Sequence, residues 1–309
     1  TAENTVFELV ANNGGRIVSK SLIPEIRYHS LLAEVPGGTL RGILSNIDSN
    51  ELVQNNNIML FRPSGQQIPS DANFEEAATS SFNQIQLKDN NPRIAIFDGV
   101  PLENHDALRG GIIVDDPDDF TSSYSVHNRT HGTQMCSLVL RGDLEFNAEP
   151  IDMPVYVRPI MKPNLQQGGE LIPDNILLVD LIHRAVKRIK EGEDGNPPTA
   201  PMVKVINFSI GDPRRIFYNS ISPMARLLDW LSWKYDILFI ISAGNVSIPF
   251  RTPSVSAFNT ADRSEQSRQI FSNLIEQRSE SRLIAPAESI NNITVGAAHT
   301  DFSSILPQD

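Results

Sequence analysis

Residues 94–100 read Ile94-Ala95-Ile96-Phe97-Asp98-Gly99-Val100, a short apolar run that ends in an acid and a glycine. Runs of this length are typical of strands buried on both faces of a parallel sheet. In such sheets, chemistry gathers just beyond the carboxyl ends of the strands. The stretch therefore predicts an interior strand, with Asp98 at the edge where a functional site would form.

The rest of the chain repeats this strand pattern with amphipathic helices in between. One predicted helix follows Asp174, the expected N-cap, and ends near Gly192, and another begins with Ser222 as N-cap and Pro223 in its first turn. Alternating strands and helices predict an α/β fold, a mostly parallel sheet with helices on both faces. The predicted strands are Arg93–Phe97, Pro154–Arg158, Lys204–Phe208, Ile237–Ser242 and Asn292–Gly296.

The first 63 residues have a different rhythm, helix-strand-strand-helix-strand, which predicts a small α+β domain of the ferredoxin-like type. That domain would need one more strand ahead of Thr1, so we expect the chain to be cut at this end. Residues 64–90 are polar and predict a linker, 91–309 form the main domain, and 250–282 are a polar insertion with one weak helix. The predicted elements at the start are helix Thr5–Ala11, strands Arg16–Ser19 and Arg27–Glu34, helix Thr39–Ile47 and strand Asn57–Arg62.

Charge and composition exclude several classes of function. The formal net charge of −11 repels a phosphate backbone, which argues against nucleic acid as a partner. The longest uncharged apolar stretch, Ile237–Ala243, is far short of the roughly 20 residues of a membrane-spanning helix, so no membrane partner is expected. A single cysteine, Cys136, excludes an intrachain disulfide, and no signal peptide is visible. These features predict a cytoplasmic protein.

Three polar residues stand where this sheet would carry chemistry. Asp98 ends the first strand, His131 opens a predicted helix with Gly132 and Thr133, and Asn245 follows the run 237–242. A serine hydrolase needs such a set: a carboxylate fixes the imidazole tautomer, the imidazole takes the proton of the nucleophile, and an amide stabilises the oxyanion.

In this order the residues resemble the subtilisin-like (subtilase) serine peptidases. His131-Gly132-Thr133 is identical to the family's histidine motif, residues 205–211 are similar to one wall of its specificity pocket, and 242–245 to the other wall. The resemblance implies an endopeptidase acting on peptide or protein substrates, with Asp98, His131 and Asn245 as catalytic residues. The substrate-binding residues that it implies are Ser209, Ile210, Gly211, Ser242, Ala243 and Gly244.

Two departures from the family pattern matter. Asp98 is followed by Gly99, where serine or threonine is commoner, and the Gly-Thr-Ser motif of the nucleophile is absent from the 309 residues. We therefore expect the serine beyond Asp309, and the chain as given to be inactive. Residues 1–63 resemble the propeptide domain of subtilases, an intramolecular partner, and together with Arg141-Gly142-Asp143-Leu144 they resemble the intracellular bacterial type.

The same residues allow other interpretations. A subtilase-fold pseudopeptidase or peptide-binding regulatory module would keep the fold without cleavage. A haloacid-dehalogenase-type phosphatase would share Asp98-Gly99 but needs an aspartate at position 96, which is Ile96. The acidic run 115–119 could hold calcium through its carboxylates, although a solvated acidic loop is favoured. No other cofactor or metal is expected.

Overall fold

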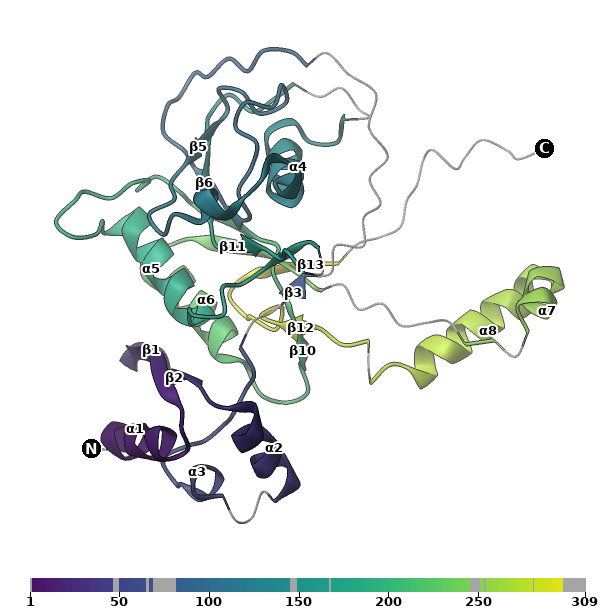
Figure 1. Ribbon diagram of the computed structural model, residues 1–309. Coiled ribbons are helices and arrows are strands. Elements are labelled where there is room, and N and C mark those ends of the chain that lie inside the picture. The colour runs from purple at the N-terminus through teal and green to yellow at the C-terminus, as the bar shows by residue number, and fades with distance from the viewer. Residues whose placement is uncertain are drawn as a thin grey trace. The chain divides into compact units, whose positions relative to one another are not determined.

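The structure, a computed structural model, describes residues 2–46, 50–64, 67–68, 82–144, 149–166, 168–244, 251–252, 254–279 and 281–296 (Figure 1). The chain divides into two compact units, Thr1–Val203 and Lys204–Asp309. Parallel strands and helices build each of them, so the predicted α/β fold class is confirmed.

Three parallel strands form the centre of the first unit. They are β4 (Ile94–Asp98), β5 (Ile112–Val114) and β6 (Val155–Pro159), with β6 between the other two. Every residue of β6 is buried, as expected of an interior strand. Helix α4 (Thr130–Arg141) packs Cys136 and Leu140 into the cluster that contains Ile96. This packing fixes the start of α4 near the end of β4.

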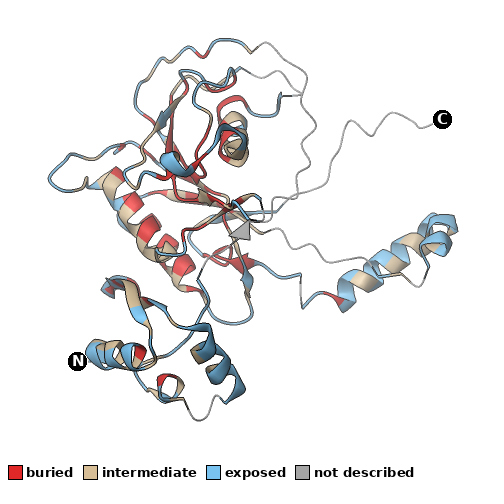
Figure 2. Ribbon diagram, viewed as in Figure 1, coloured by how far each residue is buried: buried red, intermediate tan, exposed pale blue. Residues whose placement is uncertain are grey.

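Helix α5 (Leu178–Lys190) covers the same unit with one apolar side. Its buried residues recur at helical spacing and appear as red bands on the ribbon in Figure 2. The predicted N-cap is wrong. The cap position is Leu177, and the carboxylate of Asp174 instead pairs with the ammonium group of Lys162 at 2.7 Å.

The second unit repeats the parallel arrangement with β9 (Val205–Phe208), β11 (Leu238–Ser242) and β13 (Ile293–Val295), with β11 in the middle. Helix α6 (Pro223–Tyr235) begins as predicted, because the Ser222 hydroxyl accepts a hydrogen bond from the Ala225 N–H at 3.0 Å. The sequence did not predict the antiparallel pair β10 (Asp212–Ile216) and β12 (Ile284–Ala285).

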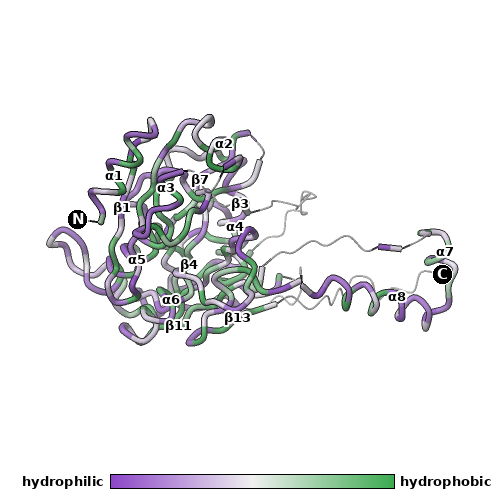
Figure 3. The backbone as a smooth tube through the Cα atoms, turned by 90° about the horizontal axis from the view of Figure 1, so that it is seen from below, coloured by the Kyte–Doolittle hydropathy of each residue, from purple (hydrophilic) through white to green (hydrophobic). Residues whose placement is uncertain are grey.

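The polar insertion contains two helices, α7 (Val255–Thr260) and α8 (Arg263–Glu276), where one weak helix was predicted. Hydrophilic residues predominate along α8 (Figure 3), and its apolar residues lie in the second half of the helix. Neither helix has a buried residue, and large side chains such as Phe271 are exposed. None of the helices among the described residues is long and apolar enough to cross a bilayer.

The N-terminal segment of the first unit is a two-stranded hairpin with helices. Its elements are α1 (Ala2–Asn12), β1 (Arg16–Ile23), β2 (Tyr28–Glu34), α2 (Gly37–Ser45) and α3 (Glu51–Gln54). The predicted strand 57–62 is wrong: a turn at 56–57 precedes it, and Met59 is 92% exposed. An apolar run becomes a strand only when a neighbouring edge pairs with it. The described residues of this segment therefore show no four-stranded ferredoxin-like sheet.

Part of the predicted linker is built into the first unit. Strand β3 (Gln67–Ile68) pairs antiparallel with β8 (Glu170–Leu171), which also pairs with β7 (Lys162–Pro163). Further along, Ile85 packs in the same core cluster as Ile96. The domain boundaries at 63/64 and 90/91 stay predictions.

Candidate active site

The structure brings together two of the predicted catalytic residues. Asp98 ends β4 with its side chain fully buried, and His131 lies in the first turn of α4. His131 Nδ1 and Asp98 Oδ1 are 2.6 Å apart, and the Gly99 N–H donates to the same oxygen at 2.7 Å. Asp98 can therefore fix the imidazole with its Nδ1 proton toward the carboxylate, which leaves Nε2 to exchange a proton with a reacting group.

The residues after His131 explain why the helix can begin so close to the strand end. A side chain at Gly132 would collide with the backbone carbonyl of Gly99. The Thr133 hydroxyl accepts from the Leu102 N–H at 2.9 Å and donates to the Arg129 carbonyl at 2.5 Å. The three consecutive residues thus have separate roles. His131 supplies the imidazole, Gly132 lets the helix approach the backbone of Gly99, and the Thr133 hydroxyl ties the helix to Leu102 and Arg129.

The surroundings of His131 favour its charged form. Burial lowers its pKa, but the hydrogen bond and charge of Asp98, with the charge of Glu170, outweigh burial and raise the pKa to about 9. A histidine that is charged at neutral pH cannot accept a proton. For His131 to act as a base near neutral pH, the negative charge around it must fall, because less negative charge lowers its pKa.

Glu170 is a member of the site that the sequence did not reveal. It lies on β8 with 6% of its surface exposed, and the Tyr124 hydroxyl donates to its Oε1 at 2.5 Å. Burial, followed by the charge of Asp98, raises the pKa of Glu170 to about 7. The polar stretch 168–170 carries no motif. The one sequence feature that could have pointed to Glu170 is Gly99, at a position where serine or threonine is commoner.

Asp98, His131 and Glu170 are also the group among the described residues with the geometry to hold a metal ion. One donor atom from each lies within 4.8 Å of the others. However, the 2.6 Å hydrogen bond already engages His131 Nδ1 with Asp98. This engagement favours an acid–imidazole pair over a metal centre.

The predicted substrate-binding residues all belong to the second unit. The Ser209 hydroxyl accepts from the Asn207 amide at 2.9 Å, Ile210 is buried, and Ser242 ends β11. The Ala243 N–H donates to the Val295 carbonyl at 2.9 Å, which aligns this segment with β13. Asn245, the predicted oxyanion donor, lies outside the described residues.

A residue that the sequence did not single out joins these two segments. The side chain of Ile284 occupies the space beside both Gly211 and Gly244, and a Cβ at Gly211 would lie 2.5 Å from Ile284 Cδ1. The Ile284 N–H also lies 3.4 Å from the Ala243 carbonyl oxygen. The two predicted pocket walls therefore meet across one apolar side chain.

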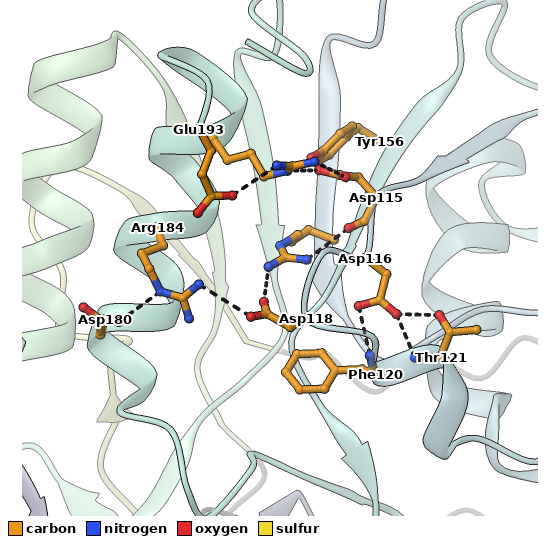
Figure 4. Close-up of polar contacts among 11 residues, drawn as sticks. Asp115, Asp116, Asp118, Phe120, Thr121, Tyr156, Asp180, Arg184 and Glu193 are labelled. Atoms are coloured by element: carbon orange, nitrogen blue, oxygen red, sulfur yellow. Dashed lines mark hydrogen bonds and ion pairs between the residues drawn. The ribbon is translucent and has the colours of Figure 1, made fainter. Parts of the chain in front are cut away.

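The acidic run 115–119 is neither a solvated loop nor free to bind a cation with all its carboxylates. Figure 4 shows that Asp115 and Asp118 face arginine side chains. Arg188 binds Asp115 through two nitrogens, at 2.8 and 3.0 Å, and the buried Arg158 pairs with Asp118. Asp116 accepts from the backbone N–H groups of 120 and 121. These carboxylates hold the loop to β6 and α5.

A buried aspartate that orients a histidine at the carboxyl end of a parallel strand is an arrangement that serine hydrolases use. The model of the subtilase family, Peptidase_S8, matches residues 89–308. The chain therefore belongs to the subtilase family of peptidases. The resemblance drawn from the motifs is confirmed.

Solved structures of leader peptidases are similar to this chain at low sequence identity. The epidermin leader peptide processing serine protease EpiP from Staphylococcus aureus is 16% identical, with a TM-score of 0.43, over 96% of this chain and 67% of that protein. The nisin leader peptidase NisP from Lactococcus lactis is 15% identical, with a TM-score of 0.34, over 68% and 61%. The match to the prenylagaramide maturation protease PagA spans 56% of that protein. No curated protein sequence matches.

Proposed function

We propose that this chain is part of a serine endopeptidase that hydrolyses peptide bonds with an Asp-His-Ser triad. The observation that carries the proposal is the 2.6 Å hydrogen bond between His131 Nδ1 and the fully buried Asp98 at the end of β4. Family membership supports the same reaction class.

In this mechanism Asp98 orients His131 and stabilises its charged form. His131 takes the proton of a serine hydroxyl as that oxygen attacks the substrate carbonyl, and then gives the proton to the leaving amine. The side-chain amide of Asn245 would donate to the oxyanion of the tetrahedral intermediate. The segments 209–211 and 242–244 would form the walls of the pocket for the substrate side chain.

The nucleophile of this proposal comes from sequence after Asp309, because residues 1–309 contain no Gly-Thr-Ser motif. Strand β3, which follows the N-terminal segment in the predicted linker, supports a propeptide role for the region ahead of the main domain, since it pairs with β8, and Glu170 of β8 lies beside Asp98 and His131. An extended segment that adds a strand next to a catalytic site is a common mode of peptide binding and of inhibition.

A serine-directed fluorophosphonate probe tests the proposal. A longer chain from the same gene should be labelled stoichiometrically at a serine beyond position 309, and His131→Ala should lose nearly all labelling because the base is missing. The chain 1–309 should remain unlabelled. A folded longer chain that resists the probe and still binds peptides would instead support the pseudopeptidase or regulatory module.

A further inference from the structure

Three features of the first unit meet at one point beside the catalytic pair. An ideal Cβ at Gly99 would collide with Oε1 of Glu170 and lie 2.5 Å from its Cδ. The Glu170 carboxyl group therefore occupies the space that a side chain at position 99 would fill. The Tyr124 hydroxyl donates a 2.5 Å hydrogen bond to the same oxygen, Oε1.

The same point contains an unsatisfied acceptor. Asp98 Oδ1 accepts from His131 and Gly99, whereas the buried Oδ2 has no hydrogen-bond partner among the described residues. A buried acceptor without a donor destabilises the folded state, because it has given up its hydrogen bonds to water. A protonated Glu170 would be a donor in its immediate neighbourhood, since the acid oxygens and the imidazole nitrogen fall within 4.8 Å.

We propose that Glu170 is a positioning residue of the active site, which occupies the space left by Gly99 and sets the negative charge that His131 meets. The role that we assign to Glu170 assumes the proposed peptidase function. It rests on the geometry of Gly99, Tyr124 and Asp98 for its support.

Two carboxyl groups in a buried space do not both ionise readily, so one of them takes a proton. Asp98 Oδ1 accepts two hydrogen bonds, from His131 and from the Gly99 N–H. Glu170 then takes the proton at neutral and lower pH, as its raised pKa of about 7 indicates. In that state Glu170 adds no negative charge beside His131, so the imidazole holds its proton less tightly than when Glu170 is ionised.

Among the described residues, three polar groups influence the charge of Glu170. They are Asp98 from β4, His131 from α4 and the Tyr124 hydroxyl. Its ladder partners, Pro163 on β7 and Ile68 on β3, carry no titratable group. A change in the charge of Glu170 should therefore act mainly on Asp98 and His131.

Imidazole NMR of the chain 1–309 with ¹⁵N-labelled histidine tests the inference without any nucleophile, so its outcome is independent of the fluorophosphonate result. His131 should titrate with a midpoint near pH 9 and show a second, smaller step near pH 7, when Glu170 ionises. In Glu170→Gln the small step should disappear and the midpoint should fall by about one pH unit, because one negative charge is gone. Glu103→Gln, at an exposed glutamate, is the matched control and should leave both features unchanged.

Tyr124→Phe keeps the test decisive if the glutamine variant fails to fold. The Tyr124 hydrogen bond lowers the pKa of Glu170, so its loss should move the small step of the His131 titration to higher pH. Titration curves that are identical in the wild type and both variants would overturn the inference. A stoichiometric metal that co-purifies with the wild type and is lost in Glu170→Gln would also overturn it, because Glu170 would then be a metal ligand.

Discussion

Glycine at position 99 and glutamate at position 170 belong together in space although they are far apart in the chain. The missing Cβ at Gly99 makes room for the Glu170 carboxyl group, and that group puts a second acid beside Asp98. A single small residue thereby makes room for a group that changes the electrostatics around the predicted catalytic residues Asp98 and His131. The motif residues alone do not describe this site.

The raised pKa of Glu170 predicts how stability depends on pH. In the unfolded chain this glutamate ionises near its ordinary pKa of about 4.3, whereas in the folded protein it does so near 7. A raised folded pKa contributes stability that is complete below the unfolded value and is lost as pH rises toward 7. Glu170→Gln should therefore gain stability relative to the wild type between pH 4.5 and 8, by about 2–3 kcal/mol.

Urea unfolding of both proteins at pH 4.5 and pH 8 measures this difference directly. The free energies of unfolding of the wild type and Glu103→Gln should differ by the same amount at pH 4.5 and pH 8, since Glu103 is exposed. If the difference in free energy of unfolding between Glu170→Gln and the wild type does not change with pH, Glu170 titrates as an ordinary surface acid.

At the scale of elements, the loop 115–121 depends on charge pairs with a buried arginine. The Arg158 side chain is 1% exposed, and Asp118 is its partner. Asp118→Ala would leave the guanidinium buried without that partner, which should cost about 3 kcal/mol in the free energy of unfolding. Asp174→Ala removes the pair of Asp174 with Lys162, in which Asp174 is 74% exposed, and should cost under about 1 kcal/mol.

Chemical denaturation of the two variants distinguishes them, and adding Arg158→Met to Asp118→Ala should recover part of the loss, because no buried charge remains. Equal costs for Asp118→Ala and Asp174→Ala would show that solvent screens the Arg158 pair as it screens a surface pair.

The elements that the sequence predicted are those whose signal is local. The buried strands at 94–98 and 238–242 are continuous apolar runs, and α6 carries its own cap in Ser222 and Pro223. Strands β3, β7, β8 and β12 have two residues each, and their pairing is set by distant partners. Periodicity cannot detect so short a strand.

The same distinction separates the site residues. Asp98 and His131 could be predicted because each follows or opens an element within a recognisable motif. Glu170 and Ile284 could not, because what gives them a role is contact with Gly99, Gly211 and Gly244 across the fold. The error at 57–62 has the opposite cause. The local pattern there is that of a strand, but these residues form no strand, because a strand also needs a neighbouring edge to pair with.

At the scale of the whole molecule, the segment after the N-terminal hairpin should act as an inhibitory strand in the proposed peptidase. Gln67 and Ile68 pair with Leu171 and Glu170, so β3 lies directly beside the strand that carries Glu170. Main-chain hydrogen bonds of this kind supply the affinity of an added strand. A substrate strand that needs the same edge must displace β3 first.

Ile68→Pro tests this competition, because proline has no N–H and disfavours the extended ladder. In a longer, serine-containing chain, the variant should show an initial rate of peptide hydrolysis about tenfold higher than the wild type, since each lost hydrogen bond weakens the added strand by about 1 kcal/mol. Ile68→Val keeps the N–H and should behave as the wild type. Equal initial rates for the proline and valine variants, measured before the N-terminal segment is cleaved, would mean that β3 does not obstruct the substrate. The pairing of β3 with β8 would then serve to hold the strand that carries Glu170 in place.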